Sequence, residues 1–388
     1  MRHIFLILIL ALQCMAAVSQ TSSNDLKISI LTCAHGDQIY SSFGHCAFRA
    51  VSASRGIDQV YNYGTFNFRQ PYFVLKFVKG FLNYSVSTYS YSRFAREYIR
   101  DGRQVIEQEL NLSAEQTQKM FDYLEWNSLE ENRYYKYNFL EDNCATRIRD
   151  VISSACGPSV IFPDTTYSFS LRHTINERIE EMPWFRLGIT LLMGLPVDRK
   201  ANAMTAMFIP DYVYLTLRQT KIAGADGHTS PIVSDERIVI PAEHPVDRTD
   251  ILTYISPSLV FWLIFAALAL ATFYEVKGGK FHPGIDRTVL CVTGVFGLLF
   301  AVMWLLTEHT VTAWNLNLLW AWPTHLAAAW NVRSAKPFWA RYYKCGAVIT
   351  GALTVLGPLM PQHYDVAFYP IMMIITLRLT RLGFCNRQ

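Results

Sequence analysis

The sequence of 388 residues lacks most of the patterns that would assign it to a common functional class. It has no internal repeat, no low-complexity tract, no glycine-rich loop for phosphates, and no histidine, cysteine and carboxylate spacing typical of a metal site. We therefore expect no cofactor and no metal. The eight cysteines are spread along the chain, too few in one segment for a disulfide framework, and a bridge between Cys33 and Cys46 stays open.

Long apolar runs are also absent from residues 20–250, although 51% of the whole chain is hydrophobic. A membrane-crossing helix needs about 20 apolar residues, so this segment has the composition of a soluble domain. The residues before it, RHIFLILILALQCMAAVS (2–19), combine basic residues, a short apolar run and small residues. That order predicts a signal peptide over residues 1–19 rather than an uncleaved anchor, and an exported domain over residues 20–250.

The composition changes abruptly after residue 250. Apolar stretches predict five transmembrane helices in a polytopic membrane domain over residues 251–388. The expected spans lie near residues 257–274, 288–306, 312–330, 345–362 and 366–377.

Lysine and arginine are missing from two of the four connections between these spans, the ones around Glu308 and His363. Because basic residues gather on the cytoplasmic side of a membrane, the alternation places the C-terminus inside and the domain 20–250 outside. The basic positions are Lys277, Lys280, Arg287, Arg333, Lys336, Arg341, Lys344, Arg378, Arg381 and Arg387. The formal net charge of +4 largely reflects this bias, so we expect no nucleic-acid partner.

The exported domain begins with strands and continues with helices, which predicts an α+β fold. Short β-rich segments cover residues 26–33, 44–51, 58–66, 83–90 and 103–111. Ser113 and Gln116 form the pattern of a capping box before a helix over residues 114–130. Further helices are expected over residues 144–155 and 174–181, and a loop over residues 220–236.

One cysteine stands where a helix begins, in YKYNFLEDNCATRIRDVISSA (135–155). Asp142 or Asn143 would serve as the N-cap, which puts Cys144 in the first helical turn. There the unpaired backbone amides and the helix dipole favour the thiolate and lower the pKa of the thiol. Cys144 is therefore our candidate nucleophile, although a cysteine in a helix is more often an ordinary buried thiol.

A thiolate nucleophile also needs a general base, which is usually a histidine. His45 follows Gly44 at the start of a predicted strand, where a rigid sheet edge could hold the imidazole against a helix N-terminus. Its neighbour Cys46 would point to the opposite face and cannot share the role. His35, in the turn CAHGDQIY, could replace His45, and Asp37 could simply cap that turn.

A histidine on a strand, then further strands, then Asn-Cys at a helix start is an order similar to the circularly permuted branch of the papain-like, NlpC-like fold. That branch includes the lecithin:retinol acyltransferases, in which the cysteine takes an acyl group from a phospholipid as a thioester. Longer motifs resemble the Lnb family of lipoprotein N-acyltransferases, which carry an exported domain and a polytopic membrane tail. These motifs are LTCAHGDQIYSSFGHCAFR, VYNYGTFNF, YFVLKFVKGFLNYSVS, EQELNLS, EDNCATRIRD, MPWFRLGITLLMGLPVDR, MFIPDYV and LLTEHTVTAWNLNLLWAWPTHL.

The resemblance implies an enzyme of the bacterial inner membrane with a periplasmic catalytic domain and a cytoplasmic C-terminus. Cys144 would attack an ester of a membrane phospholipid. The α-amino group of the N-terminal diacylglyceryl-cysteine of a lipoprotein would then take the acyl chain. His45 would act as general base and acid, and Asn62 or Tyr63 in VYNYG could accept its other N–H.

Polar residues in the membrane part suggest a role for it beyond anchoring, because polar groups inside spans are more often functional. We predict that Asn315 and Asn317 help form a cleft for a lipid head group or a lipoprotein, facing the catalytic domain. Nearby tryptophans have an ordinary alternative interpretation as interfacial belt residues. The other residues expected at the substrate cleft are His35, Asp37, Glu308 and His309.

Two other functions compete with this interpretation. The NlpC-like fold also serves periplasmic cysteine amidases and peptidases that act on peptidoglycan. Such hydrolases have no need of five spans, and this sequence lacks a recognisable wall-binding module. In the non-enzymatic alternative the chain is a membrane scaffold, and Cys144 is a buried structural thiol.

Overall fold

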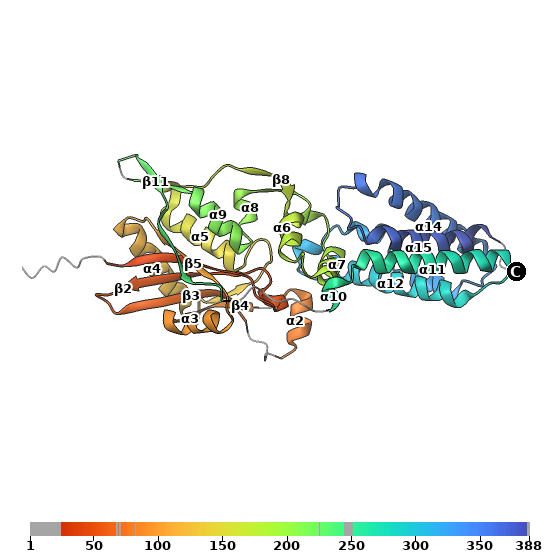
Figure 1. The fold of residues 1–388 in the computed structure, drawn as a ribbon, viewed down its shortest axis with the longest axis horizontal. Helices are drawn as coiled ribbons and strands as arrows, with labels where there is room; N and C mark the ends of the chain where they lie inside the picture. Colours follow the sequence, from red (N-terminus) through yellow and green to blue (C-terminus); the bar gives the residue numbers. More distant parts are fainter. Residues whose placement is uncertain are drawn as a thin grey trace, which may run out of the picture.

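The computed structural model describes residues 25–66, 69, 71–81, 83–224, 226–243 and 251–385. An N-terminal sheet domain and a C-terminal group of helices lie at opposite ends of an elongated molecule (Figure 1). This arrangement confirms the prediction of a mixed strand and helix domain followed by a helical region. The expected signal peptide, residues 1–19, lies outside the described residues.

A seven-stranded antiparallel sheet forms the centre of the N-terminal domain, in the order β12-β5-β1-β2-β3-β4-β6. Its strands are β1 (Lys27–Cys33), β2 (His45–Ser52), β3 (Ile57–Thr65), β4 (Asn83–Ser90), β5 (Val105–Leu110), β6 (Tyr134–Lys136) and β12 (Val233–Ile240). All five predicted strands are present, because their alternating apolar side chains fill the cores on the two faces of the sheet.

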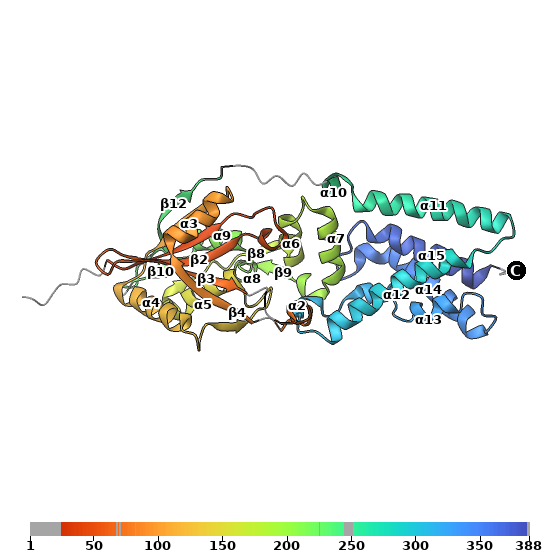
Figure 2. The same ribbon diagram turned by 90° about the horizontal axis from the view of Figure 1, so that it is seen from below.

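Helices cover both faces of this sheet (Figure 2). On one face lie α4 (Ala114–Ser128), α5 (Cys144–Cys156) and α9 (Pro210–Gln219), and on the other lies α3 (Tyr91–Arg100). Cys46 belongs to the core on the α5 side, whereas Cys33 belongs to the core on the α3 side. The sheet therefore separates the two thiols, which excludes the bridge that the sequence left open, and both are free.

The predicted helix starts are accurate where a capping residue marks them. Ser113 and Gln116 form the expected capping box at the start of α4. Helix α5 begins at Cys144, as expected, and ends at Cys156. The helix predicted over residues 174–181 is α6 (Leu171–Arg178), which begins three residues earlier because Ser170 is its N-cap.

The expectation of a loop over residues 220–236 is wrong. β10 (Lys221–Ala223) and β11 (Thr229–Pro231) form a hairpin that pairs with β7 (Val160–Ile161), and β12 begins at Val233. Side chains of β12 are mostly exposed because it is the edge strand of the large sheet. An exposed edge tolerates a polar composition, which gave this segment the appearance of a loop.

A layer of short elements connects the sheet domain with the helical region. It contains β8 (Thr166–Ser170), α6, α7 (Pro183–Leu192), β9 (Lys200–Asn202) and α8 (Ala203–Ala206). The buried guanidinium of Arg172 holds this layer together: it donates to Asp198 Oδ2 at 2.8 Å and to the carbonyl oxygens of Met193 and Gly194 at 3.0 and 3.1 Å. The turn after α7 is thus tied to α6.

The C-terminal region consists of α10 (Ile251–Tyr254), α11 (Pro257–Lys277), α12 (Pro283–Leu305), α13 (His325–Trp330), α14 (Pro337–Leu356) and α15 (Phe368–Phe384). Among the helices in the described part of the chain, α11 and α12 are long and apolar enough to cross a membrane. Arg378 of α15 is buried between Glu275 of α11 and Asp286 of α12 and pairs with both carboxylates. This charge cluster fixes α15 against the two longest helices.

The third expected span, residues 312–330, is not a continuous helix. Two 3-10 turns, Thr310–Thr312 and Leu316–Leu319, precede α13. This irregular segment packs closely on α12, where a Cβ added to Gly294 would lie 2.7 Å from the backbone nitrogen of Leu326. Irregular backbone is tolerated at membrane depth when protein surrounds it, and the glycines of α12 allow that close approach.

Candidate active site

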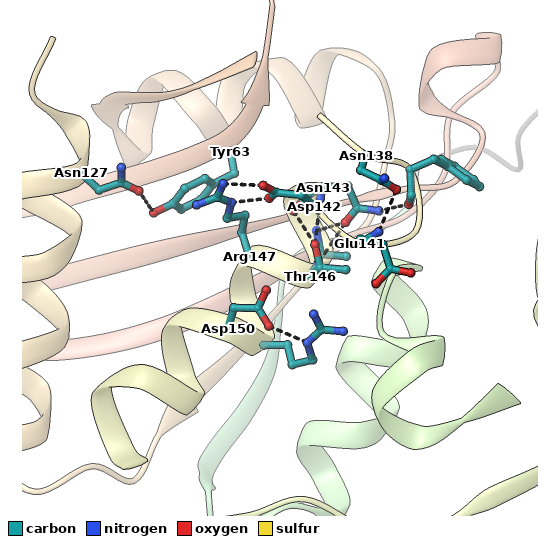
Figure 3. A network of polar contacts seen from close by, with 12 residues as sticks. Tyr63, Asn127, Asn138, Glu141, Asp142, Asn143, Thr146, Arg147 and Asp150 are labelled. Carbon is teal, nitrogen blue, oxygen red and sulfur yellow. Dashed lines mark hydrogen bonds and ion pairs between the residues drawn. The ribbon is translucent and has the colours of Figure 1, made fainter. Parts of the chain in front are cut away.

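The start of α5 is fixed by the side chain of Asn143. Its Oδ1 accepts hydrogen bonds from the backbone amides of Ala145 and Thr146 at 2.8 and 2.9 Å. Its Nδ2 donates to the carbonyl oxygens of Phe139 and Phe208 at 2.8 and 2.9 Å. Asn143 is therefore the N-cap, and it also joins the helix start to two neighbouring segments (Figure 3). Cys144 is the first residue of the helix.

Asp142 does not cap helix α5 and forms an ion pair instead. Its carboxylate pairs with Arg147, and the Oδ2 to Nη2 distance is 2.6 Å (Figure 3). The guanidinium of Arg147 also lies over the ring of Tyr135, 4.3 Å from its centroid. Burial, the largest influence, raises the pKa of Asp142, and the pair with Arg147 lowers it less strongly. Of the two predicted caps, only Asn143 caps the helix.

His45 lies at the start of β2 and contacts Cys144. The imidazole lies close enough to the thiol for the charge and hydrogen bonding of each to act on the pKa of the other. The Nε2–H of His45 donates a hydrogen bond to Oδ1 of Asn62, on β3. Three side chains from two strands and one helix thus form a chain, Cys144 to His45 to Asn62.

Tyr63, the alternative partner for His45, faces another group. Its hydroxyl donates to Oδ1 of Asn127 at 2.7 Å, and its ring is buried in the core on the α5 side (Figure 3). Successive residues of a strand point to opposite faces, so Asn62 and Tyr63 cannot both reach the imidazole. Asn62 is the residue that does.

A glycine on β3 makes room for the meeting of the thiol and the imidazole. Gly64 has a φ of +90°, and a Cβ added there would lie 3.5 Å from the Cβ of Cys144 and 3.9 Å from Cε1 of His45. The pairing of β3 with β4 is irregular between Asn62 and Thr65. Gly64 is not among the predicted site residues, although a glycine inside a strand often marks close approach of another group.

The charges of Cys144 and His45 stabilise each other. Burial is the largest influence on the pKa of Cys144 and raises it, but the charge and hydrogen bond of His45, with the amides of Cys46 and Ala145, bring the pKa below its ordinary value. Burial likewise lowers the pKa of His45, but Cys144 and Asn62 together raise it above the ordinary value. Both directions favour the thiolate and imidazolium pair over the neutral pair.

The other buried thiols of the domain lack such a partner and behave in the opposite way. Burial raises the pKa of Cys33 to about 12 and that of Cys156 to about 11. Cys46 also has its pKa raised by burial. Among the thiols of the described sheet domain, Cys144 is the one whose surroundings lower the pKa.

Aromatic side chains lie near the thiol, and none of them is among the residues predicted from the sequence. The rings of Tyr84 and Tyr137 stack with centroids 4.2 Å apart, and the ring of Phe66 lies 4.9 Å from Tyr84. Burial, and then the charge of Cys144, raises the pKa of both tyrosines, to about 12 for Tyr84. Tyrosines in segments such as NYSVS and YYKY are ordinary in strands, so no separate sequence signal marks these rings.

The remaining residues predicted at a substrate cleft lie in two other places. His35 follows β1 in a loop, and its charge acts on Asp211, while the side chain of Asp37 is exposed. Glu308 follows α12, where its carboxylate pairs with Lys136 of β6, and the amide of His309 bonds the Thr307 hydroxyl at 3.4 Å. The structure therefore does not gather these residues around Cys144.

Asn315 and Asn317 are buried at the junction of the two regions. Their Nδ2 groups donate to the carbonyl oxygen of Leu191, at the end of α7, at 2.8 and 3.0 Å. Because the side-chain amides of Asn315 and Asn317 are buried and hydrogen-bonded within the protein, they cannot also contact a substrate. The burial argues against the predicted cleft role and indicates that both amides join the helical region to α7 of the connecting layer.

Comparisons with known proteins agree with this division into two regions. A family model described as the Lnb N-terminal periplasmic domain matches residues 15–173, and one described as the Lnb transmembrane domain matches residues 248–387. No curated protein and no solved structure matches the chain. The periplasmic and transmembrane domains fit a protein of the inner membrane. The chain therefore belongs to the Lnb family and is a membrane protein related to lipoprotein maturation.

Proposed function

We propose that this protein is a lipoprotein N-acyltransferase in which Cys144 carries the acyl chain. The observation that supports it best is the chain of contacts from Cys144 to His45 to Asn62, formed at the N-terminus of a helix. Such an arrangement activates a thiol, positions a proton carrier and orients that carrier. The arrangement of His45 on a strand and Cys144 on a helix also supports a permuted papain-like fold, which we propose for the sheet domain.

The first half-reaction takes an acyl chain from a phospholipid. The Cys144 thiolate attacks the carbonyl carbon of an ester, so that a C–S bond forms and the C–O bond to the glycerol oxygen breaks. His45 gives its proton to the leaving oxygen, which releases a lysophospholipid. The products of this step are an acyl thioester on Cys144 and a neutral imidazole on His45.

The second half-reaction gives the chain to a lipoprotein. The α-amino group of a diacylglyceryl-cysteine attacks the thioester, a C–N bond forms and the C–S bond breaks. His45 takes the proton that the amine loses, which restores the thiolate and imidazolium pair. Asn62 is proposed to orient the imidazole through both steps.

The oxyanion formed in each step needs hydrogen-bond donors, and most backbone amides in the first turn of α5 already have partners. The amides of Ala145 and Thr146 are already bonded to Asn143, and that of Arg147 bonds the Asn143 carbonyl oxygen at 3.0 Å. Among the first-turn amides of the described helix, the N–H of Cys144 is left. We propose that this group donates to the oxyanion, as it would in any thiol acyltransferase of this geometry.

The test uses a bacterial host that lacks lipoprotein N-acylation. Wild type, Cys144→Ala and Cys144→Ser are expressed, and the mass of the N-terminal peptide of a lipoprotein is measured by mass spectrometry. We expect one added acyl chain with wild type and none with either variant. Cys156→Ala is the matched control, because it removes a thiol from the other end of the same helix and should keep the activity.

Two results would contradict the proposal. One is a lipoprotein without the added chain in cells that contain well-folded wild type at normal levels. The other is acylation that continues in Cys144→Ala. Release of peptides from purified peptidoglycan by wild type, lost in Cys144→Ala, would instead favour the hydrolase.

A further inference from the structure

A short arm of the sheet domain carries apolar side chains that no other part of the described protein covers. It consists of residues 71–81, with α2 (Phe73–Lys79) at its centre, and we call it the α2 arm. Tyr72 is 79% exposed and Leu75 is 55% exposed, and Val78 and Phe81 are exposed as well. The arm contains two lysines and no acidic residue. Four exposed apolar residues in one short segment are unusual for a surface that faces water.

The α2 arm lies beside the place where the chain leaves the membrane helices (Figure 2). The amide of Glu308, just after α12, donates to the carbonyl oxygen of Lys79 at 3.0 Å. Gly80 has a φ of +74°, and a Cβ added there would lie 3.2 Å from the Cβ of Glu308. The arm is thus in direct contact with the outer end of a helix that is long and apolar enough to cross the membrane.

Tryptophans mark the level of the membrane surface at this point. Trp304, in the last turn of α12, packs against Trp314, and their ring centroids are 4.9 Å apart. Trp314 is exposed, as are Leu305 and Leu306 at the end of α12. Tryptophan prefers the boundary between lipid tails and head groups, which favours a place for the arm at the depth of the periplasmic leaflet. Lysines at the same depth suit the phosphates of the head groups.

The other side of the α2 arm leads to the active site. The arm is an insertion between β3, which carries Asn62 and Gly64, and β4, which begins with Asn83 and Tyr84. Phe66, where β3 ends, contacts Tyr84, and Tyr84 stacks on Tyr137 beside Cys144. Packed aromatic rings therefore connect the base of the arm with the neighbourhood of the thiol.

We propose that the α2 arm inserts into the periplasmic leaflet of the bilayer and guides a phospholipid acyl chain from it toward Cys144. The occupant of the exposed apolar face is thus the phospholipid of the membrane that the C-terminal helices cross. The guidance of a chain to Cys144 rests on the proposed acyltransferase function. The lipid contact itself stands on the exposure of Tyr72 and Leu75 and on the contact with Glu308.

The lipid contact is tested without any activity measurement. Leu75 is replaced by the photoreactive residue p-benzoylphenylalanine in the full chain, held in nanodiscs of phosphatidylethanolamine and phosphatidylglycerol. The control has the same replacement at Ile161, another exposed apolar residue, on β7. β7 belongs to the small sheet with β11, at the end of the molecule far from the helical region (Figure 1).

We expect phospholipid adducts at position 75 and few or none at position 161, measured by mass spectrometry after irradiation. Equal adduct yields at the two positions would overturn the lipid contact. A phosphatidylglycerol-rich disc should give more adducts than a neutral phosphatidylcholine disc if Lys76 and Lys79 bind phosphates. Equal yields in the two discs would remove that part of the proposal.

The guidance is tested with Leu75→Asp and Val78→Asp combined, against Ile161→Asp. We expect formation of the acyl thioester from bilayer phospholipid to fall by about tenfold or more, because charges on lipid-facing side chains oppose insertion. Acylation of Cys144 by a short water-soluble thioester should be unchanged, since that reagent needs no bilayer. An equal fall with both acyl donors would overturn the guidance, as would no fall with either.

The two proposals fail in different ways. If wild type forms no acyl thioester from phospholipid while adducts appear at position 75, the acyltransferase function and the guidance are refuted and the lipid contact stands. If wild type forms the thioester and no adducts appear at position 75, the function stands and the α2 arm has no part in it.

Discussion

Helix α5 has a cysteine at each end, and the two ends give the same side chain opposite properties. Cys144, at the N-terminus, lies beside His45 and the backbone amides of Cys46 and Ala145, and its pKa is lowered. Cys156, in the last turn, is buried among apolar residues, and burial raises its pKa to about 11. The helix is continuous, and both cysteines contact the same core.

The difference shows what turns a thiol into a nucleophile. Burial raises the pKa at both ends, so burial alone makes a thiol inert. At the N-terminal end, the histidine and the backbone amides lower the pKa of the thiol by more than burial raises it. At the C-terminal end, the charge of Lys119 lowers the pKa by less than burial raises it. The following variants and measurements test this contrast, in order of decreasing expected effect.

Alkylation should distinguish the two thiols directly. We expect iodoacetamide at pH 7 to label Cys144 at least about 100-fold faster than Cys156, because a pKa of about 11 is roughly two units above that of an ordinary thiol. Peptide mass spectrometry over time gives both rates in one sample of native protein. Similar rates at the two positions would mean that the helix end does not activate Cys144.

Removing the histidine should make the two ends alike. In His45→Ala, burial remains and the stabilising charge is lost, so the pKa of Cys144 rises. We expect labelling of Cys144 at pH 7 to slow by about tenfold for each unit by which its pKa rises, because only the thiolate reacts. His228→Ala, which removes an exposed histidine, is the control and should change nothing. Unchanged labelling in His45→Ala would assign the low pKa to the helix start alone.

The role of Gly64 can be tested by comparing its replacement with the same replacement at Gly56, which also has a positive φ. Gly64→Ala and Gly56→Ala both place a side chain at positive φ, which costs about 1–2 kcal/mol in each case. Only Gly64 faces Cys144 and His45, whereas a Cβ at Gly56 would meet nothing within 4 Å. We expect similar losses of thermal stability and a roughly tenfold slower reaction of Cys144 in Gly64→Ala alone. Equal reaction rates would show that the site adapts to the methyl group.

The N-cap provides a smaller effect that again separates the ends of α5. Asn143→Ala removes the cap and leaves two carbonyl oxygens without their donor, so it should destabilise the protein by about 1–2 kcal/mol. Ser113→Ala, at the exposed N-cap of α4, should cost about 1 kcal/mol. Chemical denaturation measures both losses. Only Asn143→Ala should also slow the labelling of Cys144, because only that cap positions the thiol; slowing in both variants would indicate a global effect.

The smallest expected effect is a change in pH dependence. Asn62 raises the pKa of His45, so Asn62→Ala should lower it. The active pair contains the imidazolium, which is lost as the pH rises through the pKa of His45. The rate of acyl thioester formation, plotted against pH, should therefore begin to fall at a lower pH in Asn62→Ala than in wild type. Tyr63→Phe, which breaks only the bond to Asn127, should leave that pH unchanged. A shift in both variants, or in neither, would deny Asn62 its orienting role.

The sequence predicts those parts of the fold that local patterns determine. Alternating residues predict the strands, Ser113 predicts the start of α4, and Asp142 or Asn143 predicts the start of α5, where Asn143 is the cap. The pairing of Cys144 with His45 could be predicted because Cys144 begins a helix and His45 begins a strand, and such helix and strand ends can lie side by side. The choice between Asn62 and Tyr63 needed the structure, because it depends on which face of β3 turns toward His45.

Other features depend on contacts between distant segments, which local patterns do not contain. β12 is polar because it is an edge strand, so it resembled a loop. Asn315 and Asn317 were correctly noticed as unusual in a span, but their partner is the end of α7, and no local signal indicates it. The irregular third span exists because Gly294 of α12 allows backbone to approach, a relation between two segments.

The position of β12 sets the order in which the sheet can be completed. β12 pairs with β5, although a long stretch of chain separates them, and it is the last strand before the first membrane helix. During export, the edge of β5 therefore stays open until residues 233–240 have crossed, when α11 is already approaching the bilayer. A chain cut after residue 173, where the first family match ends, would keep that edge open and would associate with other unfinished chains. Biogenesis of the exported domain is thus tied to the arrival of its own anchor.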